Sequence, residues 1–122
     1  MDDRNTDIAL ILTFNNALNA RDVGAMIACL SEDTVFENTE PAPDGTRYSG
    51  LPAVRSFWED FFRGSQQAMI EVEDIFGAEG RYTMLWTYRW VDLQGAAGHV
   101  RGVDVYRVVY GKITEKLSYV KG

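Results

Sequence analysis

The sequence predicts an α+β fold in which three N-terminal helices pack on one face of a curved, mostly antiparallel sheet. In the first half of the chain, apolar residues recur at helical spacing. After residue 68, apolar and polar residues alternate, and glycines separate the alternating segments as they do in a meander of strands. Helices followed by such a sheet form two layers, and an open, curved sheet makes a cone with a pocket.

Three helical segments are expected before the sheet begins. Apolar spacing predicts the first over residues 6–20. The second begins at Asp22, whose side chain can cap the free backbone amides, and it should end within residues 31–33. The third has Pro52 in its first turn, carries an aromatic stripe, and stops at Gly64. These helices supply the apolar layer that covers the sheet.

The strands follow from alternation and from turn residues. A short strand is expected at Thr34–Asn38, before an irregular, proline-containing loop at Pro41–Gly45. In the first of the later strands, apolar Ile70, Val72 and Phe76 alternate with acidic residues that we expect to be solvated. The strands expected after residue 68 span residues 70–76, 81–93, 98–110 and 112–120.

The strand expected at Arg81–Leu93 has one face made almost entirely of large side chains: Tyr82, Met84, Trp86, Tyr88 and Trp90. The pattern alone turns this aromatic row toward the helices. In the alternative arrangement the row lies on the outer face, where a second subunit would cover it. Because so many large side chains are rarely left in water, we expect the second arrangement, a homodimer formed through the sheet, with Arg89 inside the cone.

Length, charge and composition exclude several classes of protein. The 122 residues suit one domain, and 18 acidic against 12 basic residues give a net charge of −6, which disfavours nucleic acid as a partner. Polar residues interrupt the first helix, so we expect no membrane span and a cytoplasmic location. Cys29 and His99 stand alone, which excludes an intrachain disulfide and a Cys/His zinc site. We therefore expect no metal and no cofactor.

The order of elements, together with three local motifs, resembles the nuclear transport factor 2-like superfamily, and within it the SnoaL-like proteins. The motifs are the segments 30–36, 48–57 and 102–108. The resemblance covers residues 1–122 as a single SnoaL-like domain and implies the cone-shaped, cystatin-like form of the α+β fold. The superfamily holds ketosteroid isomerases, limonene epoxide hydrolases, scytalone dehydratases, polyketide cyclases and proteins with no known reaction, so the fold alone names no chemistry.

Ketosteroid isomerases use a tyrosine on the first helix and a protonated aspartic acid on a long strand as an oxyanion hole, and an aspartate after the first strand to move the proton. The resemblance matches Asp104 to the aspartic acid of the oxyanion hole. Phe14 falls at the tyrosine and Asn38 at the base. Phenylalanine has no donor and an amide does not shuttle protons, so the isomerase set is incomplete.

Limonene epoxide hydrolases use a Tyr and an Asn on the first strand with an Asp-Arg-Asp trio on later strands. Asn38 and Arg89 fit that pattern, whereas Phe36 replaces the tyrosine. Val91 and Ser118 fall at the two acids, so the hydrolase set is also incomplete. Polyketide cyclases of the SnoaL type use an acid/base aspartate, a role that Asp104 could fill.

The resemblance implies a pocket that binds a small apolar molecule, lined by Phe14, Phe36, Asn38, Trp58, Arg89, Asp104 and Ser118. Two functions remain open. The protein is an isomerase, cyclase or hydrolase that works by acid/base chemistry around Asp104, with Asn38 and Arg89, or it is a non-catalytic ligand-binding or dimeric assembly module.

The state of Asp104 is equally open at this stage, because its neighbours in the strand are apolar. It is either a neutral acid that donates a hydrogen bond to a ligand or the partner of Arg89 or Lys116 in an ion pair. We expect Lys116 itself at a solvated position on the rim of the pocket. Asn38 has a second interpretation, as a strand-end residue that ties down the following loop.

Overall fold

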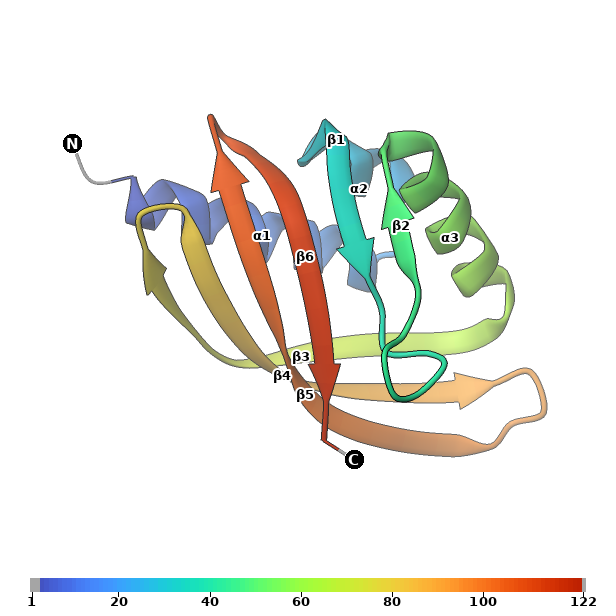
Figure 1. Ribbon diagram of the computed structural model, residues 1–122. Helices are drawn as coiled ribbons and strands as arrows, with labels where there is room; N and C mark the ends of the chain where they lie inside the picture. The colour runs from blue at the N-terminus through green and yellow to red at the C-terminus, as the bar shows by residue number, and fades with distance from the viewer. Residues whose placement is uncertain (1–2, 122) are drawn as a thin grey trace.

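The computed structural model describes residues 3–121, and the side chains of all of these except residues 65–67. Three helices cover one face of a six-stranded sheet, which confirms the predicted α+β fold (Figure 1). The helices are α1 (Arg4–Asn19), α2 (Val23–Ala28) and α3 (Leu51–Arg63). The strands are β1 (Leu30–Glu37), β2 (Arg47–Ser49), β3 (Ser65–Ala78), β4 (Arg81–Asp92), β5 (Ala97–Val109) and β6 (Lys112–Val120).

The strands lie in the order β2-β1-β6-β5-β4-β3, and every pair is antiparallel except β1 with β6. The long strands β3, β4 and β5 bend midway, so that one end of each runs beneath α3 (Figure 1). None of the helices in residues 3–121 is long and apolar enough to cross a membrane. The bend produces the expected cone, with α3 closing one side of it.

The N-terminal half departs from the prediction where short elements meet. Asp22 caps α2 as expected, its carboxylate accepting from the amide of Ala25 at 3.1 Å. The helix nevertheless ends at Ala28, and β1 already begins at Leu30. Strand β2 has only three residues, too few for an alternating pattern to be recognised.

Two register shifts change which side chains face the helices. In β3 the shift lies between Val72 and Asp74, after which Ile75 turns to the core and Phe76 is 52% exposed. The β5–β6 pair shifts beside Val108, so that Ile113 and Lys116 are both buried although they stand three residues apart. A bulge adds a residue to one strand and reverses the alternation beyond it.

Helix α1 is fixed to the sheet by polar contacts as well as by its apolar stripe. The hydroxyl of Tyr82 donates to the buried carboxylate of Asp7 at 2.7 Å. Asn15 and Asn19 both donate to the carbonyl of Ile70, and the Ile70 amide donates to Asn19 at 2.7 Å. These asparagines therefore satisfy the outer backbone groups of an edge strand.

The aromatic row of β4 faces the helices, so the expected outer-face arrangement is wrong. Tyr82, Met84 and Trp86 are buried in the core, where they contact the apolar stripes of the helices. Arg89 consequently lies outside the cone, where it pairs with Glu71 at 2.9 Å. The helices therefore bury the apolar side chains that the homodimer was expected to bury.

The turn between β5 and β6 suggests a stabilising substitution. Tyr110 and Gly111 both have positive φ, 50° and 74°, which is a type I′ turn, and the Tyr110 side chain is fully exposed. Asparagine adopts this conformation with less strain than tyrosine. We expect Tyr110→Asn to raise the free energy of unfolding by about 0.5–1 kcal/mol and the melting temperature by about 2–4 °C. Tyr110→Phe, which keeps the strain, should melt with the wild type; equal melting of all three proteins would contradict the prediction.

Candidate functional site

A cavity of about 620 Å³ opens inside the cone, between α3 and the inner faces of β1 and β4–β6. Its walls are largely aromatic, and the rings contributed by β1, α3 and β4 are Phe36, Phe57, Trp58, Phe61, Trp86, Tyr88 and Trp90. Phe61 of α3 meets Tyr88 of β4 edge to face, with ring centroids 6.0 Å apart. Such a concave, aromatic site with few polar groups is typical of small-molecule pockets.

The floor of the cavity is a buried polar cluster around Asp104, which is 1% exposed. Lys116 Nζ lies 3.3 Å from Asp104 Oδ2, and the Ser118 hydroxyl donates to Oδ1 at 2.6 Å. Tyr106 also donates to Oδ2, at 3.4 Å. Burial, with the charge of Asp104 as a second cause, raises the pKa of Tyr106 well above its usual value, so this hydroxyl stays a donor.

Lys116 is the main functional candidate whose position differs from the prediction. We expected it in solvent on the rim, but it is 5% exposed and lines the cavity. Its ammonium donates to Ser118 Oγ at 3.2 Å and lies 4.4 Å from the centre of the Phe36 ring and 5.6 Å from a ring centre of Trp58. Lys116 lies two residues before Ser118 and on the same face of β6, which was the signal available in the sequence.

Two glycines on β5 allow indole rings to lie flat along the wall of the cavity. Gly102 is opposite Trp86 and Gly98 is opposite Trp90. A Cβ added at Gly98 would stand 2.4 Å from the Trp90 ring, and one at Gly102 would stand 2.8 Å from the Trp86 ring. The cross-strand Trp–Gly pairs thus build the aromatic wall, which a single strand read alone does not reveal.

Two indole donors in this wall have no acceptor among the described residues. Trp58 Nε1 and Trp86 Nε1 are buried and have no hydrogen-bond partner among the described residues. Burial raises the pKa of Tyr88 to about 12, so its hydroxyl remains protonated at neutral pH. A buried donor without an acceptor costs about 1–3 kcal/mol. The wall therefore holds two indole donors that the described residues leave without an acceptor.

The rim carries Asn38 and a mixed set of charges. The Asn38 side-chain oxygen accepts from the amides of Thr46 at 2.8 Å and Glu40 at 3.3 Å, which ties down the following loop. The charged side chains at the mouth are Glu40, Asp60, Asp92 and Lys121. Asn38 therefore has a structural task in addition to its place at the cavity.

The structure brings together most of the predicted pocket residues. Those that line the cavity are Phe36, Asn38, Trp58, Asp104 and Ser118. Phe14 is instead a core residue, 1% exposed, and Arg89 is on the opposite face of the sheet. Of the two cationic partners considered for Asp104, Lys116 is the one in contact. The catalytic and binding roles assigned to these residues remain predictions.

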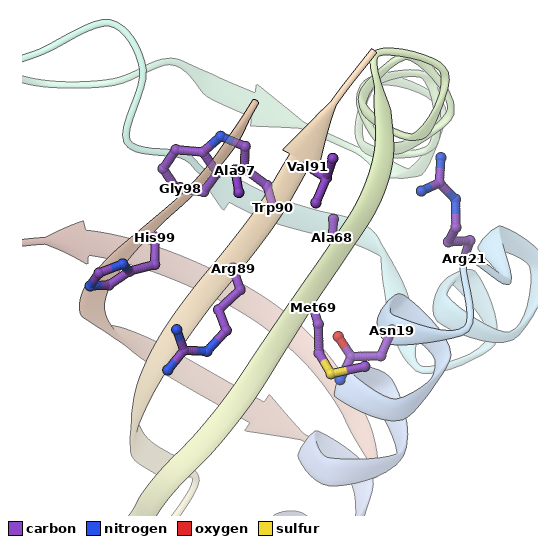
Figure 2. A pocket seen from close by; sticks show the side chains of 10 residues that line it. All are labelled: Asn19, Arg21, Ala68, Met69, Arg89, Trp90, Val91, Ala97, Gly98 and His99. Carbon is purple, nitrogen blue, oxygen red and sulfur yellow. The ribbon is translucent and has the colours of Figure 1, made fainter. Parts of the chain in front are cut away.

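Arg89 lines a second hollow, of about 670 Å³, at the β3 edge of the sheet. Figure 2 shows Arg89 and His99 on neighbouring strands, while Arg21 lies on the other side of β3 near the end of α1. Arg21 lies over the ring of Phe62, 5.2 Å from its centre, and donates to the Phe62 carbonyl. The arginines are thus already engaged by neighbouring groups on opposite sides of the edge strand.

The chemistry of the inner cavity rests on the Asp104–Lys116 pair and the hydroxyls beside it. These groups can bind an acceptor atom, stabilise a developing negative charge or exchange a proton. Within residues 3–121 no three His, Cys, Asp or Glu side chains come together in a way that could hold a metal ion.

Comparison with known proteins identifies the family. An NTF2-like protein of unknown function from Mesorhizobium loti is 33% identical, with a TM-score of 0.82, over 100% of this chain and 96% of that chain. A candidate polyketide cyclase from Xanthomonas campestris is 21% identical, with a TM-score of 0.87, over 98% of this chain and 93% of that chain.

The Rv0760c protein of Mycobacterium tuberculosis, solved in complex with estradiol-17β-hemisuccinate, is 21% identical to this chain. Its TM-score is 0.81, over 93% of this chain and 92% of that chain. None of the curated proteins matches the chain. The model of the SnoaL-like domain matches residues 11–116. The chain therefore belongs to the SnoaL-like domain family.

Proposed function

We propose that this protein binds a small, largely apolar molecule in the inner cavity, with a polar end of that molecule against the Asp104–Lys116 pair. One observation carries the proposal: an aromatic cavity of about 620 Å³ ends on a single buried polar cluster. Aromatic walls supply affinity by excluding water, and the polar cluster fixes orientation. The estradiol derivative bound by the Mycobacterium tuberculosis neighbour supports a small-molecule occupant.

A second candidate function, acid/base conversion of the bound molecule, is favoured by the position of the proton-bearing groups. The ammonium of Lys116 and the hydroxyl of Ser118 both line the cavity and both contact Asp104. Asp104 then serves with Lys116 rather than as an isolated neutral acid. Arg89 has no part in this proposal because it lies outside the cone.

Filling the cavity tests the binding function. Val100 of β5 lines the cavity, whereas the exposed His99 on the same strand faces the outer side and pairs with Arg89. We expect Val100→Trp to weaken binding of the neutral fluorophore N-phenyl-1-naphthylamine by about fivefold or more, because the added indole occupies the ligand's space. Fluorescence titration measures the dissociation constant.

His99→Trp is the matched control, because it places the same ring on the same strand on the opposite face. It should bind the fluorophore as the wild type does. Equal loss in both variants would place the bound fluorophore outside the cavity and would contradict the proposal. Absence of binding to the wild type at concentrations up to the solubility limit of the fluorophore would contradict it as well.

The homodimer through the sheet remains a prediction, but the structure changes which residues support it. The aromatic row no longer supports it, because that row is buried under the helices. The outer face carries instead half-buried Leu85, Val103 and Val105 at its centre and exposed Tyr119 beside them. We propose this apolar stripe as the dimer surface.

A further inference from the structure

We propose that the occupant of the inner cavity is an organic anion, with one negatively charged oxygen bound to the ammonium of Lys116 and an aromatic body along the Trp86–Trp90 wall. The inference rests on the proposed function and deepens it by naming the charge of the ligand and the residue that recognises it. Three features of the described residues carry it: the hydrogen bonds of Lys116, those of Asp104, and the unpartnered indoles.

The first feature is the incomplete coordination of Lys116. An ammonium has three hydrogens. Asp104 Oδ2 and Ser118 Oγ accept two of them, at 3.3 and 3.2 Å. Among the described residues, the further partners of this ammonium are aromatic faces, with Nζ 4.4 Å from the ring centre of Phe36. An aromatic face is a weaker partner than an anionic oxygen. An anionic oxygen of a ligand can therefore bind the third N–H.

The second feature is the unequal sharing of charge between the two ions. Asp104 accepts from three donors, because Tyr106 and Ser118 contribute hydroxyl hydrogens in addition to the ammonium. Lys116 has one anionic partner, since Ser118 already gives its hydrogen to Asp104. The carboxylate is therefore well stabilised without further help, whereas the ammonium can accept a second anion.

The third feature is the surplus of donors beside this ammonium. The indole N–H groups of Trp58 and Trp86 lack partners, and both indoles line the cavity. The Trp58 ring lies beside Lys116, 5.6 Å from Nζ to its centre. A ligand oxygen bound here would share the ammonium with Asp104 and Ser118, while the two indole N–H groups of this wall have no acceptor of their own among the described residues.

The acidic side chains at the mouth restrict where the negative charge can lie. Asp60 is bound by Arg63, and Asp92 accepts from the amides of Gln94 and Ala96. Glu40 and the oppositely charged Lys121 also lie at the rim. An anionic group held at the mouth would meet these carboxylates, while one at the floor meets Lys116. The arrangement therefore selects a monoanion with an apolar remainder.

A matched pair of fluorophores tests the inference. 8-Anilinonaphthalene-1-sulfonate and N-phenyl-1-naphthylamine share the same ring system, and only the first carries an anionic group. We expect Lys116→Met to weaken the sulfonate by about tenfold or more while the neutral compound binds as before, because a charge-assisted contact is lost and the apolar wall is kept. Lys116→Arg retains a cation and should keep the preference for the sulfonate.

Asp104→Asn should act in the opposite direction. It removes the anion that shares Lys116, so the sulfonate should bind more tightly than to the wild type, by about threefold or more, with the neutral compound unchanged. If this variant does not fold, the two Lys116 variants decide the question. The Val100→Trp variant must weaken both fluorophores, which confirms that both occupy the inner cavity.

The outcomes separate this inference from the function on which it rests. Binding of the neutral compound together with equal loss of both fluorophores in Lys116→Met overturns the anionic ligand and leaves the binding function standing. A preference for the sulfonate that survives in Lys116→Met also overturns it. Failure of both fluorophores to bind the wild type overturns the proposed function and the inference together.

Discussion

Asp104→Asn is expected to lower the free energy of unfolding by about 3–5 kcal/mol, because it leaves the ammonium of Lys116 buried without its counter-ion. The pair is 3.3 Å apart and the two side chains are 1% and 6% exposed, so the ammonium would keep little hydration to compensate for the lost carboxylate. Denaturation by urea at neutral pH, without any ligand, measures the effect. The exposed pair Arg101–Glu73 supplies the control: Glu73→Gln should change the free energy of unfolding far less than Asp104→Asn, because water screens that pair.

The double variant Asp104→Asn with Lys116→Met identifies the cause of that loss. If the cost comes from an uncompensated charge, removing the second charge should restore most of the stability. If the double variant is as unstable as Asp104→Asn, the loss comes from the hydrogen bonds of Tyr106 and Ser118 instead. A single variant as stable as the wild type would contradict the buried ion pair altogether.

Gly102→Ala is expected to lower the free energy of unfolding by about 3 kcal/mol, the upper part of the range for overpacking. The added Cβ would stand 2.2 Å from the carbonyl oxygen of Tyr119 on β6, in addition to its clash with Trp86. A ring can move toward the cavity, but a backbone carbonyl in a paired strand cannot move without breaking the β5–β6 ladder. Thermal and urea denaturation measure the change.

Two other glycines serve as comparisons for Gly102. The three atoms nearest to a Cβ added at Gly98 all belong to the side chain of Trp90, which can move, so Gly98→Ala should be tolerated better. Gly24→Ala in α2 meets nothing closer than 3.6 Å and should be neutral or stabilising, because alanine favours a helix. A Gly102→Ala variant that is as stable as Gly24→Ala would mean that β5 and β6 are more widely separated than described.

The long helices and strands were predictable from the sequence because apolar residues recur in each of them with the period of a helix or of a strand. The third helix, marked by Pro52 and Gly64, and the strand Lys112–Val120 agree with the structure. The same reasoning missed what depends on pairing between strands. Strand β2 is stabilised by its ladder with β1, and Phe76 is exposed because of a bulge that simple alternation does not reveal.

The candidate site was predictable in part, and for the same reason. Asp104 and Ser118 stand opposite one another on β5 and β6, so a correct strand prediction brings them together. Lys116 was placed in solvent because charged side chains usually are. Plain alternation puts it on the face of Ser118, and the sequence alone does not show that Phe36 and Trp58 cover the ammonium there.

The asparagines of α1 have a consequence for association between chains. Strand β3 is an edge of the sheet, and at Ile70 both of its outer backbone groups are occupied by Asn15 and Asn19. An edge whose amide and carbonyl are already bonded cannot template another strand there. Detachment of α1 would free these groups while the rest of the sheet stayed paired. We therefore expect self-association to begin from molecules in which this one helix has separated, before the fold as a whole is lost.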